Sequence, residues 1–146
     1  MESLPHLLLR NNSFERAIHG WDIRSALEPY APLSPNALAA IVDFFAACPH
    51  WFFLPAARVS TPIRYRFALT GALSRQWDMV VEGDKAHIGP AADATPANVT
   101  FACEGETLVL VMCGRIGFDA ALGDQRIIPT GDMAVVPTFK KWFQGV

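Results

Sequence analysis

The stretch VTFACEGETLVLVMCGRIGFDAAL, residues 99–122, decides the fold class of this 146-residue chain. Alternation of apolar side chains over residues 99–103 predicts a strand with one buried face. Residues 107–113 are then apolar on nearly every side, and Gly114 follows, as expected for a buried helix that stops at a glycine. A short helix is predicted around residues 119–122. A strand therefore leads here into helices that belong to the core.

Further strands are expected on both sides of this stretch. Residues 63–69 and 76–81 alternate between apolar and polar side chains, and a turn then leads to a short strand over residues 86–88, which together predict a meander. Downstream we expect a strand at residues 126–128 and a turn over PTGD. A final amphipathic helix passes through Trp142, and Pro137 should kink it or mark its start.

The first part of the chain has a helical pattern instead. Asn12 followed by Glu15 resembles a capping box, which predicts that a first helix begins there. After a Pro-rich break, Ser34 as N-cap and Pro35 at the first helical position open a second helix. That helix should stop before Pro49, because a residue preceding proline disfavours the α conformation.

Composition limits the function classes. A formal charge of -2 without a Lys/Arg cluster gives no electrostatic footprint for nucleic acid. No apolar run approaches the roughly 20 residues of a bilayer span, and the first residues lack the pattern of a secretion signal. We therefore expect a soluble, cytoplasmic protein with no nucleic-acid partner. Cys48, Cys103 and Cys113 have no CxxC spacing and are expected to be buried, reduced thiols.

The order of these elements resembles the sterol-carrier-protein fold. Four segments further resemble the C-terminal domain of mycothiol-dependent maleylpyruvate isomerase-like proteins: RYRF (64–67), WDMVVEG (77–83), the stretch 99–122 and KKWFQGV (140–146). The resemblance implies an α+β fold with a mostly antiparallel sheet of about five strands covered by helices. We assign this domain to residues 58–146 and a helical extension to residues 1–57.

The resemblance also implies a metal-site remnant. In the two-domain relatives a DinB-like, metal-binding helical bundle precedes the sterol-carrier-like domain, and its last helix carries Glu, His and Asp at a spacing that falls here on Glu15, His19 and Asp22. Another histidine of that site lies on an earlier helix, which this chain is expected to lack. A catalytic zinc usually needs three protein ligands, so Glu15 and His19 form an incomplete half-site and no bound metal is expected. His6 could become a third ligand, but nothing in the sequence orients it. Alternatively, Glu15 caps the helix and His19 bonds to protein or water.

An apolar cavity between sheet and helices, closed by the C-terminal helix, is the binding site in lipid-binding relatives. Such a site needs a concave surface lined by aromatic and aliphatic side chains. The candidate ligand-binding residues here are Trp77, Met79, Phe101, Leu108, Met112, Phe118, Phe139, Trp142 and Phe143. The same residues can instead form an ordinary packed core.

Signals for catalysis are weak. The chain has no GxSxG elbow, no GxGxxG and no Walker loop. Arg115 is the one weak catalytic candidate, because it follows the buried helix and could face the cavity; it could equally donate to the carbonyls at the helix end.

We therefore predict a non-catalytic binding module for a small apolar ligand or lipid, without a cofactor. One alternative is an isomerase or S-transferase that depends on zinc or another divalent metal and on mycothiol, and that needs the missing helical bundle. A second alternative is a structural dimerisation module without a ligand.

Self-association is the first testable prediction. The helices over residues 12–48 keep apolar stripes that the missing bundle would cover in two-domain relatives, and exposed apolar patches tend to find partners. We expect a symmetric homodimer, measured by light scattering. A monomer at micromolar concentration would contradict this expectation.

Overall fold

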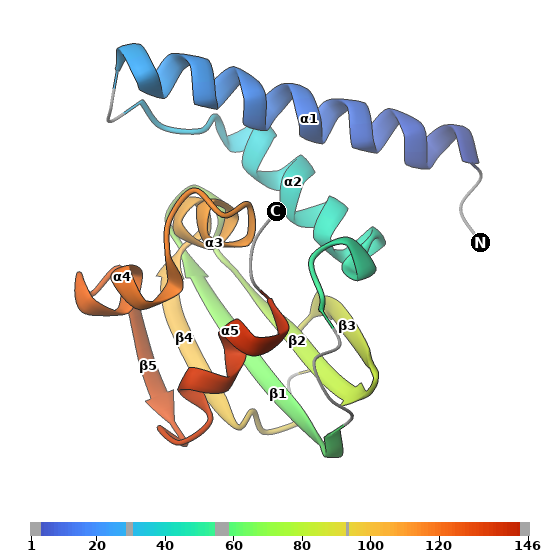
Figure 1. Cartoon of the computed structure of the whole chain (residues 1–146), viewed down its shortest axis with the longest axis vertical. Coiled ribbons are helices and arrows are strands. Elements are labelled where there is room, and N and C mark those ends of the chain that lie inside the picture. The colour runs from blue at the N-terminus through green and yellow to red at the C-terminus, as the bar shows by residue number, and fades with distance from the viewer. Residues whose placement is uncertain (1–3, 29–30, 55–58, 93, 144–146) are drawn as a thin grey trace.

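The structure is a computed structural model that describes residues 4–28, 31–54, 59–92 and 94–143, with side chains described from residue 11 onward. Its centre is a five-stranded sheet in the order β3-β2-β1-β4-β5 (Figure 1). The strands are β1 (Val59–Thr70), β2 (Arg75–Gly83), β3 (Lys85–Pro90), β4 (Val99–Glu104) and β5 (Ile127–Gly131).

Only the central pair, β1 and β4, is parallel, and the other three neighbouring pairs are antiparallel. The expected α+β fold class, with a mostly antiparallel sheet of about five strands and an N-terminal helical extension, is confirmed. Strand β5 is longer than expected, since Pro129 and Gly131, which we placed in a turn, both pair with β4. Proline is accommodated here because β5 is an edge strand, where a missing N–H need not interrupt a ladder.

Helices lie on one face of the sheet (Figure 1). They are α2 (Pro35–Ala47), α3 (Gly105–Met112), α4 (Phe118–Gly123) and α5 (Phe139–Trp142). Helix α2 begins as expected, with the Ser34 hydroxyl accepting from the Ala37 amide at 3.2 Å, and it ends before Pro49. The start near Pro137 is also confirmed, because a 3-10 turn over Val136–Thr138 precedes α5.

Helix α5 attaches to the sheet through Phe139, which is fully buried. Its ring lies 5.2 Å from that of Tyr65, 5.4 Å from Phe67 and 5.7 Å from Phe101. Each of these partners points from β1 or β4 to the same face, as the alternating pattern predicted. Aromatic pairs of this kind add about 0.5–1.5 kcal/mol beyond area burial, so four residues of helix suffice to hold α5 in place.

Helix α1 (Leu4–Leu27) packs on α2, on the side away from the sheet (Figure 1). Phe14 stacks on Phe44 of α2 with ring centroids 4.7 Å apart. The predicted start at Asn12 is wrong. The helix begins eight residues earlier because the leucine-rich segment favours helix and Pro5 lies in the first turn, where proline is tolerated. Glu15 is therefore inside the helix and does not cap it.

No helix within the described parts of the chain is both long enough and apolar enough to cross a membrane.

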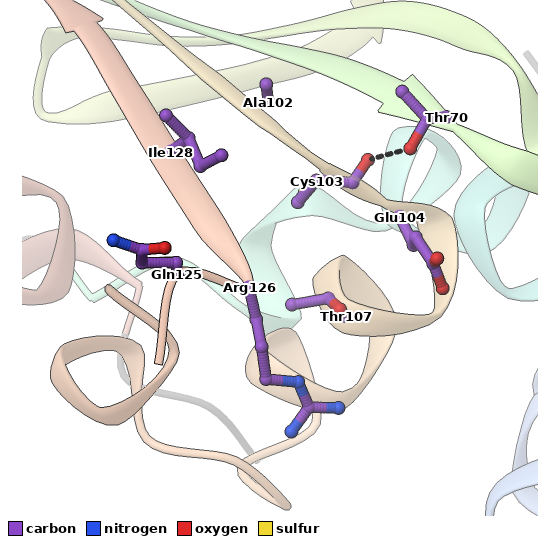
Figure 2. Close-up of a pocket in the computed structure, with 8 residues that line it drawn as sticks. All are labelled: Thr70, Ala102, Cys103, Glu104, Thr107, Gln125, Arg126 and Ile128. Atoms are coloured by element: carbon purple, nitrogen blue, oxygen red, sulfur yellow. Dashed lines mark hydrogen bonds between the residues drawn. The ribbon is translucent and has the colours of Figure 1, made fainter. Parts of the chain in front are cut away.

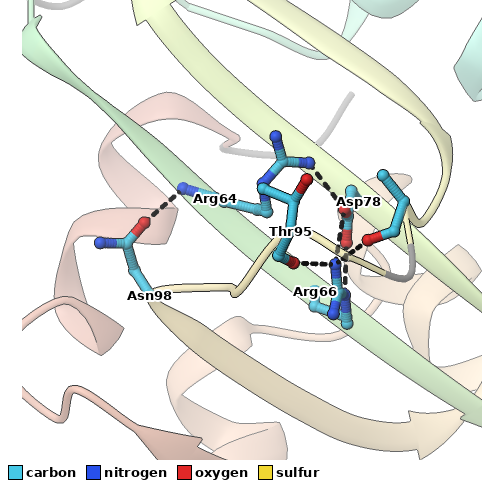
Figure 3. A network of polar contacts seen from close by, with 6 residues as sticks. Arg64, Arg66, Asp78, Thr95 and Asn98 are labelled. Carbon is cyan, nitrogen blue, oxygen red and sulfur yellow. Dashed lines mark hydrogen bonds and ion pairs between the residues drawn. The ribbon is translucent and has the colours of Figure 1, made fainter.

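The outer face of the sheet is organised around Asp78, which is only 4% exposed (Figure 3). Its carboxylate accepts from Arg64 Nη1 at 2.7 Å and from Arg66 Nε at 2.8 Å. Arg66 also donates to the carbonyls of Ala92 and Thr95, so the group ties the β3–β4 connection to the sheet. Burial alone would raise the pKa of Asp78, but the hydrogen bonds from the two arginines outweigh it and lower that pKa.

Replacing this carboxylate should destabilise the fold. We expect Asp78→Asn to lower the free energy of unfolding at pH 7 by roughly 3 kcal/mol, because it leaves two partly buried guanidinium groups without their shared anion. The pKa is lowered in the folded protein, so the stabilisation is fully present above the ordinary value of 3.8 and is lost as the pH falls through the folded value. Urea unfolding should therefore show that the free energies of unfolding of the wild-type protein and of Asp78→Asn differ less at pH 3 than at pH 7.

Asp43→Asn is the matched control. Asp43 is an exposed carboxylate 3.7 Å from Arg75, and its loss should change stability by less than about 1 kcal/mol. Equal effects of the two substitutions would contradict the role given to Asp78.

Candidate functional site

A cleft of about 280 Å³ opens between the end of α3 and helix α5, and we call it the α3–α5 cleft. Its lining combines apolar side chains and glycines with one opposite-charge pair: Val111, Gly114, Ile116, Gly117, Phe118, Asp119, Lys140 and Phe143. These residues come from α3, the α3–α4 connection, α4 and the C-terminal segment. The cleft therefore forms where three helices meet at the edge of the core.

The floor of the cleft depends on how α3 ends. Gly114 has a φ of 67°, and its amide donates to the Val111 carbonyl while the Arg115 amide donates to the Leu110 carbonyl. This pair of bonds is a Schellman motif, in which a left-handed residue turns the chain away from the helix axis. The expected glycine stop is thus confirmed. It directs Ile116 and Phe118 along the side of the cleft.

The inner wall of the cleft is aromatic. The Phe118 ring lies 5.4 Å from Phe101 and 4.9 Å from Phe139, and Phe143 stacks on Phe139 at 4.9 Å. These contacts make the wall continuous with the core. An apolar group that enters the cleft would meet side chains that offer it dispersion contacts and no hydrogen bonds.

Charge is present only at the mouth. Lys140 Nζ lies 2.6 Å from Asp119 Oδ2, and the two side chains are 48% and 68% exposed. An ion pair so exposed contributes little to stability. The ammonium can therefore exchange Asp119 for another anion at small energetic cost.

The nine predicted ligand-binding residues are all buried on the helix-covered side of the sheet. Phe118 and Phe143 line the α3–α5 cleft. The other seven pack in the core and do not line it: Trp77, Met79, Phe101, Leu108, Met112, Phe139 and Trp142. Contact of any of the nine with a ligand stays a prediction.

Arg115 faces α1 instead of the cleft. Its Nε and Nη2 atoms donate to the two oxygens of Asp22 at 3.1 and 2.7 Å, and its Nη1 donates to the Cys113 carbonyl. The hydrogen bonds from this guanidinium hold the pKa of Asp22 below its ordinary value. Arg115 therefore both satisfies a carbonyl at the end of α3 and joins α1 to the domain.

The Glu15–His19 pair is exposed on α1. Glu15 Oε2 lies 2.9 Å from His19 Nε2, and the His19 side chain is 64% exposed. Asp22 is 3.5 Å from the other imidazole nitrogen, but Arg115 already occupies both of its oxygens. Within the described residues, no group of three or more His, Cys, Asp or Glu is placed to hold a metal. The side chain of His6 lies outside the described residues.

The three cysteines are free and buried, as expected. Burial raises the pKa of the Cys103 and Cys113 thiols to about 12. Neither thiol is therefore suited to act as a nucleophile near neutral pH, since the thiolate is the reactive form.

The polar part of the cleft was missed by sequence reasoning. Lys140 and Asp119 are 21 residues apart and carry no motif, so no local signal joins them. Ile116 was also missed, although its place directly after the Gly114 stop could have suggested that it borders the end of α3.

No protein-family model and no curated protein sequence matches the chain. Among solved structures it is similar to the inverting sec-alkylsulfatase Pisa1 from Pseudomonas sp., with a TM-score of 0.54, 12% identity, and coverage of 71% of this chain and 16% of that one. A double mutant of the same alkylsulfatase gives a TM-score of 0.56 at 13% identity, with coverage of 69% and 16%. At these identities the likeness concerns the fold alone, and the chain spans 16% of the alkylsulfatase length.

Two smaller proteins are also similar. The ubiquinone synthesis protein UbiJ-SCP2 gives a TM-score of 0.48 at 17% identity, with coverage of 74% of this chain and 93% of that chain. Sterol carrier protein domain 2 of Helicoverpa armigera gives a TM-score of 0.42 at 13% identity, with coverage of 80% and 76%.

Proposed function

We propose that this chain is a non-catalytic module that binds a small apolar or amphipathic ligand, such as a short-chain lipid, in the α3–α5 cleft. The observation that carries the proposal is the separation of chemistry within the cleft: Phe118 and Phe143 form an apolar inner wall, and Lys140 stands at the mouth. An alkyl chain would bury apolar surface inside while an anionic head group met the ammonium.

The size of the cleft limits the ligand. At about 280 Å³ it lies near the lower end of the roughly 300–1,000 Å³ of ordinary ligand pockets. A short apolar chain, or the end of a longer one, fits this volume. The apolar residues beneath the cleft are already packed against one another, so a larger ligand would need α5 to move away from the sheet.

The order of the elements also supports the finer proposal that the domain is related to the C-terminal domain of maleylpyruvate isomerase-like proteins. The strand β4, the buried helix α3 with its Gly114-Arg115 end and the aromatic α5 follow one another as in that family's pattern.

Filling the cleft should block ligand binding. We expect the wild-type protein to bind a fluorescent medium-chain fatty acid saturably, with a rise in anisotropy and quenching of tryptophan emission. Ile116→Phe adds a ring to a half-buried side chain of the lining and should weaken binding by on the order of tenfold or more, since the added volume competes with the alkyl chain.

Met133→Phe is the matched control, because Met133 is 51% exposed and lies outside the cleft. Lys140→Gln should weaken binding of the fatty acid and leave binding of the corresponding alcohol nearly unchanged. Absence of saturable binding in the wild-type protein, or equal effects of the two phenylalanine substitutions, would refute the proposed function.

Exposed apolar residues on α1 support the proposal of a homodimer. Ile23 and Leu27 are 70% and 82% exposed, although both are large aliphatic side chains. A second copy of the chain that covered them would remove apolar surface from water.

The enzymatic alternative has one observation in its favour, which is the exposure of the Glu15–His19 pair to a partner. We expect purified protein to contain far less than one zinc per chain by elemental analysis, because two ligands hold the ion weakly and the adjacent Arg115 repels it. Stoichiometric zinc that Glu15→Ala removes would favour the metal- and mycothiol-dependent enzyme instead.

Asp119→Ala is the control for this measurement, since it deletes a carboxylate far from α1. Equal zinc loss in both variants would indicate nonspecific binding to surface carboxylates and would leave the enzymatic alternative without support.

A further inference from the structure

A second pocket, of about 420 Å³, lies on the other side of β4, where that strand passes into α3 and β5 begins (Figure 2). We call it the β4–β5 pocket. It differs from the α3–α5 cleft in that most of its lining residues have polar side chains: Thr70, Ala102, Cys103, Glu104, Thr107, Gln125, Arg126 and Ile128. Cys103 contributes its backbone, whose carbonyl accepts from the Thr70 hydroxyl at 3.4 Å.

Thr107 is the first residue that points to a ligand. It is only 5% exposed and lines the pocket. A hydroxyl can donate and accept hydrogen bonds, so Thr107 can bind a polar group of a molecule in the pocket.

The beginning of α3 strengthens the positive potential at this place. Thr107 is the third residue of the helix, whose first amides have no partners within the helix. The N-cap residue Glu104 makes no side-chain capping bond. The helix dipole favours an anion at such an end.

Arg126 contributes a full positive charge. Its side chain is exposed and forms no ion pair or hydrogen bond with the described part of the chain. Arg115 also follows a residue in the left-handed conformation, but its guanidinium is paired with Asp22. A planar guanidinium without a carboxylate partner is suited to bidentate binding of a carboxylate or phosphate.

The backbone of Gln125 adopts a left-handed conformation that is unusual for this residue type. It has a φ of 59°, and its amide bonds to Leu122 while the Arg126 amide bonds to Ala121. This is the same motif that ends α3, where the left-handed residue is Gly114. Glycine adopts this conformation without strain and glutamine does not. A binding role for the Gln125 side chain in the pocket would explain why this strained position carries glutamine instead of glycine.

From this convergence we infer that the β4–β5 pocket binds a small ligand through an oxyanion group, either a phosphate or a carboxylate. Arg126 supplies charge, and the Thr107 hydroxyl and the side-chain amide of Gln125 supply hydrogen bonds. The Glu104 carboxylate also lines the pocket and opposes an anion. The rest of the ligand would extend over Ala102 and Ile128.

The test is a titration of the ¹⁵N-labelled full chain with inorganic phosphate and, separately, with acetate, at constant ionic strength set by chloride. We expect saturable shifts of the Thr107 amide and of the Arg126 Nε–H group with at least one probe, and the better probe distinguishes phosphate from carboxylate. Arg126→Gln should weaken binding by on the order of tenfold, as the loss of a charge-assisted bond does. Thr107→Val should also weaken it.

Three further variants should change phosphate binding in ways that a purely structural role of the pocket residues would not produce. Glu104→Gln should tighten phosphate binding, because it removes a like charge. Gln125→Gly should raise the melting temperature and weaken binding together. Lys85→Gln removes an exposed charge on β3 and should leave binding unchanged.

Shifts that rise linearly without saturation for both probes, or equal effects of Arg126→Gln and Lys85→Gln, would overturn the inference. The fatty acid assay on the same variants separates the two sites. Arg126→Gln should bind the fatty acid as the wild-type protein does, so either proposal can fail alone.

Discussion

The contact of Phe139 with the aromatic face of β1 and β4 is the constraint on which the candidate cleft depends. Its ring touches Tyr65, Phe67 and Phe101 from the sheet and Phe118 from α4, and it is fully buried. A helix of four residues has almost no stability of its own, because helix nucleation is unfavourable. The position of α5, and with it that of Lys140 and Phe143, is therefore fixed by packing. The same dependence makes α5 the element whose displacement would enlarge the cleft.

A second constraint joins the helical extension to the domain. Helix α1 packs on α2 through Phe14, and Asp22 and Arg115 link its C-terminal half to the end of α3. The Asp22 carboxylate is thus used to hold two parts of the chain together. His19 and Glu15 remain exposed beside it. Asp22 therefore makes a structural contact, which also places the positive charge of Arg115 close to Glu15 and His19.

Elements with strong local signals could be predicted from sequence, and contacts between distant residues could not. Strand alternation located β1, β2 and β4, the Ser34-Pro35 pair located the start of α2, and Gly114 located the end of α3, because each pattern reflects backbone chemistry within a few residues. The start of α1 was missed because Asn12 can cap a helix but is equally compatible with an interior position. The polar groups of both candidate sites were missed for a different reason. Lys140 meets Asp119, and Arg126 shares a pocket with Thr107, only after the sheet has formed.

The alternation of the strands explains why the molecule has two chemically different candidate sites. On β4, Phe101 points to the helices and joins the aromatic core, while the neighbouring Ala102 points to the outer face and lines the β4–β5 pocket. On β1, Tyr65 and Phe67 face inward, and Arg64 and Arg66 face outward to Asp78. Apolar and charged groups are thereby separated by the thickness of one sheet. Since an anion is disfavoured among aromatic side chains and an alkyl chain gains nothing among charges, each face can select its own class of ligand.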